Sequence, residues 1–585
     1  MGDGLGLGDA YETTLGRIRA QEGEKAKLAM TTLMWICYSE RPLRVDELCH
    51  ALGVEIGSTH FNSDNVSAAE TVLTSCHGLV TVDREASTVR LAHHTLREYL
   101  TTHRNLFPQA QLEMAETCLA YLNSHQAKAL PAIHQPDLSS MPFLQYCSRY
   151  WGIHAKRAPS DRVILHAMKL LDQYENHVAA NSLFEQILDK DDSVEINSAS
   201  VFGELHCVSF FGIVDVMTSL LAMSDCDANQ GDCAGITPLV WAVRCGQGDA
   251  VELLLRKEAV NADKEDNCGN TPLWWAARNG HNLIVKQLLD RAEVDPDHAT
   301  NQGFTPLMEA AASGHESIVA QLLDRQEVNP DKSDNTGRTS LVWAAVYGQD
   351  SVVKQLLGRQ DVDPDKSDKE GGTPLLRAAK RGHQPVVKQL LDRQDVNPDK
   401  PDNEGNTPLS WAAMKGHESV VKQLLDRQDV NPDKPDNEGN TPLSWAAMKG
   451  HESVVKQLLD RQDVNPDKPD NEGRTPLSWA AWEGHESVAK QLLDRQDVNP
   501  DKPDNEGRTP LFRAAWEGHE LVVKQLLDRQ DVDPSKSDKN WHTPLSYAFV
   551  NGHEGVVNLL QAREPPIPTM FSVDPLEAPL SSFTL

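Results

Sequence analysis

The sequence is poor in aromatic residues, poor in basic residues relative to acidic ones, and free of long apolar runs. Only 6% of its 585 residues are aromatic, and 56 Lys and Arg stand against 86 Asp and Glu, a formal net charge of −30. Such a surface repels phosphate backbones and anionic lipid, which argues against direct nucleic-acid or membrane binding. Without an 18-residue apolar run or a secretory leader pattern, we expect a cytoplasmic or nuclear protein.

Cysteine and the common catalytic motifs are also scarce. All ten Cys lie at or before Cys268 and no CxxC pair occurs, which favours a reducing compartment over a disulfide scaffold. The sequence contains no HExxH and no phosphate-binding GxxxxGK[ST], and its Gly-rich start, residues 2–8, has no Lys to reach a phosphate. We therefore expect no enzyme activity, no catalytic residue, no cofactor and no bound metal.

The sequence is rich in one feature, an internal repeat. Thr followed by Pro or Ser and then Leu recurs at intervals of 34 residues, always with Ala five residues later and Gly nine residues later. The ten positions are Thr237, Thr271, Thr305, Thr339, Thr373, Thr407, Thr441, Thr475, Thr509 and Thr543. A degenerate copy containing Leu205 and Gly212 precedes them. Self-similarity at a fixed period predicts a solenoid of stacked units.

One unit, residues 403–436, illustrates the local structure that we expect. Thr407 can cap a helix that begins at Pro408, where the missing N–H of proline costs nothing. Gly416 suits the left-handed residue that ends this helix. In the segment that follows, residues 420–425 place Val and Leu at helical spacing. Each unit therefore predicts two short antiparallel helices and an extended loop.

This pattern resembles the ankyrin repeat. The family's TPLHxA run, Gly-His turn and paired leucines are matched here by TPLSWAA, GHE and QLL, over residues 203–562. The period is 34 instead of the usual 33, and Ser, Val, Trp, Met, Leu or Phe replaces the family His. The resemblance implies a mainly α solenoid of about eleven units with a slightly altered loop, which binds a protein partner.

Residues 25–105 predict a winged helix. We expect helices over residues 25–40, 45–52 and 67–76, and a hairpin over residues 78–83 and 89–93. The segments RPLRVDELCHAL, CHGLVTVD and VRLAHHTLREYL are similar to the winged helix that follows the NACHT domain in fungal NACHT-ankyrin proteins of the STAND class. The remaining expected regions are a disordered or residual N-terminus (1–24), a helical region (106–200) and a disordered tail (563–585).

The winged helix does not predict DNA binding. Its expected recognition helix, residues 67–76, holds Glu70 and no Lys or Arg, and residues 25–105 carry eight basic against nine acidic side chains. Groove binding needs basic groups that neutralise phosphates. A packing or regulatory module is therefore favoured.

Two repeated polar motifs predict structural roles. The His of each Gly-His pair is expected to start a helix and to hydrogen-bond locally, because no nucleophile or metal-binding pattern accompanies it. The DKPDNEG loops miss the spacing of a calcium loop and predict a solvated acidic face.

A tryptophan stands four residues after the Thr in six units. Because this position precedes the buried Ala pair, packing between helices is favoured, and a binding stripe is the alternative. The six residues are Trp241, Trp275, Trp343, Trp411, Trp445 and Trp479.

The resemblance also implies where a partner binds. In ankyrin arrays the residues seven and eight positions after the Thr, with finger positions just before the Thr, line the concave surface that grips partners. The candidate residues here are Arg244, Arg278, Lys380, Arg381, Met414, Met448, Arg474, Trp482, Glu483, Trp516 and Glu517. Met side chains are flexible and adapt to a partner surface, and Trp side chains often supply much of the binding energy. Met414, Met448, Trp482 and Trp516 therefore form a candidate ridge for binding. The alternative is that each packs on its neighbouring helix.

Near-identity of copies limits where specificity can reside. Residues 391–424 and 425–458 are identical, and the next copy, residues 459–492, differs from them at four positions. Identical units present the same groups twice, so specificity should reside in the diverged flanks unless the partner is periodic.

Two functions fit the sequence. The first is a non-enzymatic adaptor or scaffold whose array recognises a protein. One role for such an adaptor is regulation or coregulation of gene expression through other proteins. The alternative is a truncated STAND-type sensor that works with a separately encoded NTPase. A small-molecule ligand is not expected.

Overall fold

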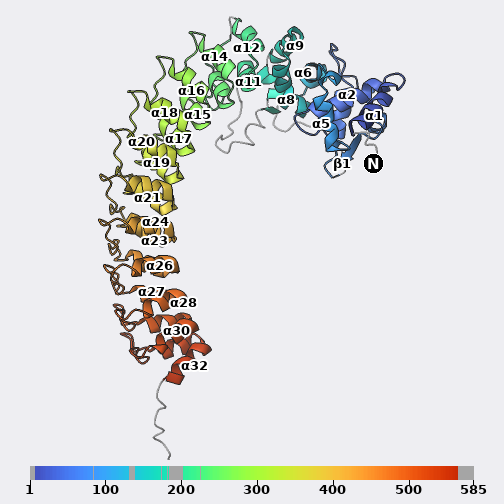
Figure 1. The fold of residues 1–585 in the computed structure, drawn as a ribbon. Coiled ribbons are helices and arrows are strands. Elements are labelled where there is room, and N and C mark those ends of the chain that lie inside the picture. Colours follow the sequence, from blue (N-terminus) through green and yellow to red (C-terminus); the bar gives the residue numbers. More distant parts are fainter. Residues whose placement is uncertain are drawn as a thin grey trace, which may run out of the picture. The chain divides into compact units, whose positions relative to one another are not determined.

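A computed structural model describes residues 7–83, 85–130, 139–172, 174–180, 182–183, 202–223 and 226–563. The chain divides into two compact units, Met1–Pro306 (unit 1) and Leu307–Leu585 (unit 2), and each is described by itself. Both are mainly helical, and strands are few (Figure 1). Apart from Arg563, the tail predicted for residues 563–585 lies outside the described residues. None of the helices in the described ranges is long and apolar enough to cross a membrane.

Unit 1 begins with the expected winged-helix region. Its helices are α1 (Leu7–Arg19), α2 (Lys25–Tyr38), α3 (Val45–Leu52), α4 (Ala69–Ser75) and α5 (His94–Thr102), and its antiparallel strands are β1 (Val80–Asp83) and β2 (Thr88–Leu91). The three predicted helices and the hairpin form within two residues of their expected ends. Residues 1–24 differ from expectation, because α1 folds there and fully buries Leu15 and Ile18.

A helical region follows and packs on α2. Its helices are α6 (Ala110–Leu122), α7 (His125–Lys128), α8 (Leu144–Arg157) and α9 (Asp161–Leu171), and single 3-10 turns lie at Ser63–Asn65, Arg104–Leu106 and Tyr174–Asn176. Trp35 of α2 meets Phe143 edge-on with ring centroids 5.4 Å apart, and the backbone N–H of Glu40 donates to the Tyr146 hydroxyl at 3.1 Å. The winged helix and the helical region therefore share one aromatic core.

The repeats form helix pairs in both units. Unit 1 contains α11 (Glu204–Phe211), α12 (Val214–Leu221), α13 (Pro238–Arg244), α14 (Gly248–Leu255), α15 (Pro272–Arg278) and α16 (Asn282–Leu289). Unit 2 contains α17 (Pro306–Ser313), α18 (Glu316–Leu323), α19 (Ser340–Tyr347), α20 (Asp350–Leu357), α21 (Pro374–Arg381), α22 (Gln384–Leu391), α23 (Pro408–Lys415), α24 (Glu418–Leu425), α25 (Pro442–Lys449), α26 (Glu452–Leu459), α27 (Pro476–Glu483), α28 (Glu486–Leu493), α29 (Pro510–Glu517), α30 (Glu520–Asp528), α31 (Pro544–Val550) and α32 (Glu554–Arg563). In unit 2 the first helices of successive repeats, from α19 to α31, pack on one another.

Helix ends follow from the repeated Thr and Gly. The Thr407 hydroxyl accepts the backbone N–H of Ser410 at 3.1 Å, and Gly416 ends α23 with φ of 72°. We expected His417 to hydrogen-bond locally, and this prediction is wrong. Its Nε2 lies 3.2 Å from the carbonyl oxygen of Lys380, 37 residues earlier, so the repeated His ties each repeat to the one before it.

The loops hold a buried aspartate where we expected a solvated acidic face. Asp436 is 9% exposed. Its Oδ1 accepts the backbone N–H groups of Glu438 at 3.0 Å and Asn440 at 2.8 Å, and its Oδ2 accepts the indole N–H of Trp445 at 2.9 Å. Equivalent aspartates bond the first helix of their own repeat in the neighbouring units, Asp402 to Trp411 and Asp470 to Trp479, so these loops are fixed to that helix.

A second aspartate of the loop, Asp433, should make the free energy of unfolding depend on pH. Asp433 Oδ2 accepts the backbone N–H of Asn465 at 2.7 Å, whereas its Oδ1 is buried without a hydrogen bond to any described residue. Burial raises the pKa of Asp433. A carboxyl whose pKa is higher in the folded chain than in the unfolded chain gains stability as pH falls through the folded pKa, because the folded state then binds more protons.

We therefore expect Asp433→Asn to raise the free energy of unfolding at pH 7 relative to the parent. This advantage should shrink as pH is lowered toward the raised pKa, where the parent carboxyl also becomes neutral. Urea denaturation at pH 7, 6 and 5 measures the difference. An advantage that is constant or grows at low pH would contradict the assignment.

The last repeat carries a strained tryptophan. Trp541 has φ of 65° and is 87% exposed, at the position where the preceding repeat has Gly507 with φ of 84°. A left-handed residue with a side chain costs about 1–2 kcal/mol. We expect Trp541→Gly to melt at a higher temperature than Trp541→Ala, since both remove the indole and only glycine relieves the strain. Equal melting temperatures would contradict this reading.

Candidate partner-binding surface

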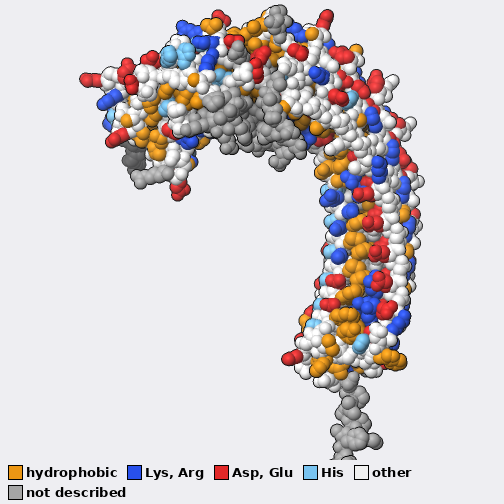
Figure 2. All heavy atoms as spheres, turned by 180° about the vertical axis from the view of Figure 1, so that it is seen from behind, with side chains coloured by type: hydrophobic (Ala, Val, Ile, Leu, Met, Phe, Trp, Pro, Cys, Tyr) orange, Lys and Arg blue, Asp and Glu red, His pale blue; other side chains and the backbone are white. Residues whose placement is uncertain are grey.

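An apolar stripe runs along unit 2 over the first helices of four successive repeats. Residues four and seven positions after the Thr lie three apart on each helix and so share a face. The apolar stripe consists of Trp411, Met414, Trp445, Met448, Trp479, Trp482 and Trp516. Figure 2 shows it as a continuous band of apolar side chains between charged rows.

The first tryptophan of each of three repeats joins the stripe through an anchored indole. Trp411, Trp445 and Trp479 donate their indole N–H to Asp402, Asp436 and Asp470 at 2.7, 2.9 and 3.2 Å. Trp479 is buried, whereas Trp411 and Trp445 are half-buried. The prediction that these tryptophans pack between helices is therefore only partly met. Each indole is held at one edge by its hydrogen bond, and the rest of the ring contributes surface to the stripe.

The second tryptophans lie beside the first. The rings of Trp479 and Trp482 stack with centroids 5.3 Å apart, and the Arg513 guanidinium lies 4.0 Å from the centroid of Trp482. Trp516 stacks on Tyr547 of the next repeat at 4.6 Å. Trp482 and Trp516, like Met414 and Met448, are half-buried. Such side chains are held in place by neighbours and still offer surface to a partner.

Charged candidates mark one edge of the stripe. We define the helix edge as the residues eight positions after the Thr: Arg381, Lys415, Lys449, Glu483 and Glu517. All five are exposed, and in residues 307–563 the first four have no ion pair or side-chain hydrogen bond. Glu517 accepts the Trp482 indole N–H at 3.3 Å. Toward the C-terminal end the edge changes from basic to acidic.

Lys380 and Arg474 are engaged within the array. The Lys380 ammonium lies 3.4 Å from the centroid of the Trp411 ring, and burial lowers its pKa. Arg474 pairs with Asp470 and Glu472, both at 2.7 Å, and its guanidinium covers Trp479 at 4.2 Å. With a side chain 12% exposed, Arg474 supports the stripe instead of projecting from it.

The opposite edge contains residues that we did not single out from the sequence. We define the finger edge as the Glu three positions before the Thr: Glu370, Glu404, Glu438, Glu472 and Glu506, all exposed. Glu370 pairs with Arg377 at 2.6 Å, whereas Glu438 and Glu506 have no ion pair in residues 307–563. The repeated Asn-Glu-Gly turn was the signal that could have identified this row.

Arg244 and Arg278 lie in unit 1 and belong to a separate aromatic cluster. The Arg244 guanidinium lies 4.9 Å from the ring centroid of Trp241 and 4.2 Å from that of Trp275. Arg278 lies 5.2 Å from the ring centroid of Trp274. Cation–π contacts of this kind stabilise the helix ends of unit 1.

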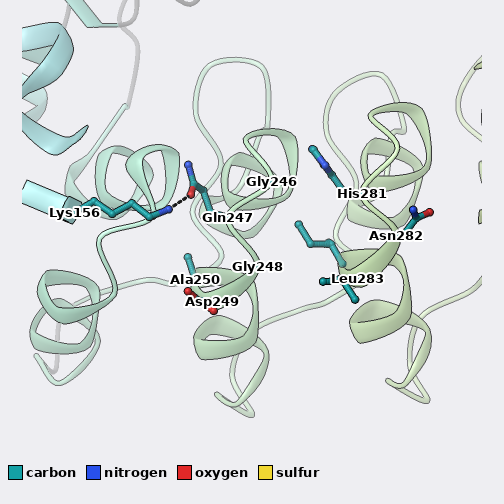
Figure 3. A pocket seen from close by; sticks show the side chains of 11 residues that line it. Lys156, Gly246, Gln247, Gly248, Asp249, Ala250, His281, Asn282 and Leu283 are labelled. Carbon is teal, nitrogen blue, oxygen red and sulfur yellow. Dashed lines mark hydrogen bonds between the residues drawn. The ribbon is translucent and has the colours of Figure 1, made fainter. Parts of the chain in front are cut away.

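Unit 1 also contains an open hollow beside α14 and α16 (Figure 3). Its volume is about 440 Å³, and it is lined by Lys156, Gln247, Asp249, His281 and Leu283 among others. Lys156 donates a hydrogen bond to the Gln247 side chain. Neither this hollow nor the rest of the described residues holds three or more His, Cys, Asp or Glu side chains placed to bind a metal ion.

Stacked helix pairs with capped Thr-Pro starts and left-handed Gly ends define a solenoid of binding repeats. The family model described as "Ankyrin repeats (3 copies)" matches residues 205–298, 282–368, 341–436, 428–504 and 496–567, more than half of the chain. The chain therefore belongs to the ankyrin-repeat proteins. Ankyrin repeats are typically non-catalytic modules that bind other proteins.

Two further comparisons concern the N-terminal part and the whole chain. Residues 17–112 match the model "GPI inositol-deacylase, winged helix domain", which confirms the winged helix and extends it to include part of α1. "Azaphilone pigments biosynthesis cluster protein L" of Monascus ruber is 23% identical over 248 residues, which cover 38% of this chain and 52% of that protein. This chain thus aligns with about half the length of that relative.

Proposed function

We propose that this protein is a non-enzymatic adaptor that binds a protein partner through the apolar stripe of unit 2. One observation carries the proposal: seven Trp and Met side chains form a continuous band, and most of them stay half-buried. Aromatic side chains of this kind dominate binding energy when a partner completes their burial. The exposed charges on both edges supply the polar rim that protein interfaces have.

The double variant Trp482→Ala/Trp516→Ala tests this proposal in the full-length protein. We expect it to reduce recovery of the specific partner at least tenfold in proximity labelling with quantitative mass spectrometry. Leu521→Ala is the matched control, because Leu521 is also a large apolar side chain, 56% exposed, and lies on the second helix α30. Melting temperatures are measured in parallel to exclude unfolding. An unchanged set of labelled proteins in the double variant would overturn the proposal.

A second candidate function starts from the winged helix of unit 1. In this reading the chain is a regulatory subunit of the STAND type that works with a separately encoded NTPase, and the winged helix is the module that contacts it. Proximity labelling with the full-length chain should then recover an NTPase, and Trp482→Ala/Trp516→Ala should still recover it, because that variant leaves the winged helix intact. Absence of an NTPase from the proteins labelled by the full-length chain would contradict this reading.

We place the adaptor in the cytoplasm or the nucleus, where coregulation of genes through other proteins is one use for such an array. The net charge of −30 supports action through proteins instead of direct DNA contact. Imaging of a fluorescently tagged full-length chain tests the location.

A further inference from the structure

The stripe has an electrostatic pattern that specifies its partner further. Over α21, α23 and α25 the helix edge is basic (Arg381, Lys415, Lys449) while the finger edge is acidic (Glu404, Glu438). Over α27 and α29 the helix edge becomes acidic. Figure 2 shows the acidic row on one side of the stripe and the change of sign on the other. A complementary partner therefore carries opposite charges on its two sides over α21, α23 and α25, and basic charge on both sides over α27 and α29.

The spacing of the repeats favours a helical partner. Directly packed helices lie about 8–10 Å apart. The stripe therefore presents the Trp and Met side chains of one repeat after another at about that interval. Seven residues of an α-helix rise about 10.5 Å, which places one heptad over each repeat with its apolar positions facing the stripe. An extended strand covers the same distance in about three residues, and its alternating side chains would face opposite ways over successive repeats.

The change of charge along the helix edge fixes the register. Because residues 391–424 and 425–458 are identical, a helix that reads only Lys415 and Lys449 can slide by one repeat without loss. Glu483 follows Lys449 in the next repeat and has no ion pair or side-chain hydrogen bond within residues 307–563, so a shifted acidic side chain would meet a like charge. Like-charge contacts suppress wrong arrangements.

We propose that the partner segment is an amphipathic α-helix of about four heptads that lies along the apolar stripe. Its first two heptads carry acidic residues facing Lys415 and Lys449, and its last two carry basic residues facing Glu483 and Glu517. Its other flank carries basic residues facing the glutamates of the finger edge. This inference rests on the function proposed above and adds the class of partner.

Three synthetic 28-residue peptides with leucine at the a and d positions serve as probes. The matched peptide has glutamate along one flank, changing to lysine in its last two heptads, and lysine along the other. The scrambled peptide has the same composition with both charges mixed on each flank, and the broken peptide is the matched one with two central prolines. We expect full-length protein to bind the matched peptide at least tenfold more tightly than either control in fluorescence anisotropy.

Variants of the full-length protein locate the contact. Lys415→Glu/Lys449→Glu should weaken binding of the matched peptide at least tenfold. Lys422→Glu/Lys456→Glu should not, because these exposed lysines lie on the second helices α24 and α26. Equal binding of matched and scrambled peptides, or of matched and broken peptides, would overturn the inference. If that occurs while Trp482→Ala/Trp516→Ala still loses its labelled partner, the adaptor function stands and only the helical class of partner fails.

Discussion

Gly416→Val should destabilise unit 2 by about 2–5 kcal/mol, combining a strained left-handed backbone with overpacking. Gly416 has φ of 72°, and an added Cβ would lie 2.6 Å from Nδ1 and 2.7 Å from Cε1 of His451. That ring cannot retreat without loss, because its Nε2 makes the bond at 3.1 Å to the Met414 carbonyl that ties the two repeats together. Chemical denaturation of the full-length chain measures the effect.

Gly552→Val is the matched control for this substitution. Gly552 has φ of 75°, but nothing lies within 4 Å of an added Cβ. It should therefore pay only the backbone strain, about 1–2 kcal/mol. If both variants lose the same stability, the contact with the next His contributes nothing and our account of repeat coupling is wrong.

Asp436→Ala should cost about 3–5 kcal/mol, because it leaves two backbone N–H groups and a half-buried indole N–H without their acceptor. The acceptor is buried and its bonds are charge-assisted, which makes each stronger than a neutral one. Asp436→Asn is informative as well. It can still accept the backbone N–H groups, but its amide would face the Trp445 N–H donor to donor, so a large part of the loss should remain.

Asp429→Ala is the control for the buried aspartate. Asp429 pairs with Arg427 at 2.6 Å, yet its side chain is 52% exposed. Exposed pairs of this kind contribute at most about 1 kcal/mol. A loss at Asp429 equal to that at Asp436 would contradict the role of Asp436 as the acceptor that organises the loop.

The repeat architecture could be predicted because its signals are local. Thr407 caps the helix that begins at Pro408, and Gly416 ends it, as the order of residues indicated. The three predicted helices of the winged helix were also indicated by local sequence. By contrast, α1 was missed because residues 7–19 show their apolar face only when Leu15 and Ile18 meet the rest of unit 1.

The sequence predicted which positions form the candidate surface, but not which groups their side chains contact. The bond from His417 to Lys380 spans 37 residues, so reasoning within one repeat assigned the His a local partner. Arg474 was grouped with the exposed charges, although the loop brings Asp470 and Glu472 to its guanidinium. Whether an indole faces solvent or a helix depends on where its N–H acceptor lies, which the order of residues does not state.

Site-specific photo-crosslinking tests the central claim that a protein partner contacts the apolar stripe. A photoreactive amino acid is placed at Lys449, on the helix edge of α25, or at Lys456, exposed on the second helix α26 of the same repeat. After irradiation in cells, our account predicts a discrete crosslinked protein from position 449 that is lost in the Trp482→Ala/Trp516→Ala background and is absent from position 456. The same adduct from position 456, or its persistence without the two tryptophans, would contradict the account.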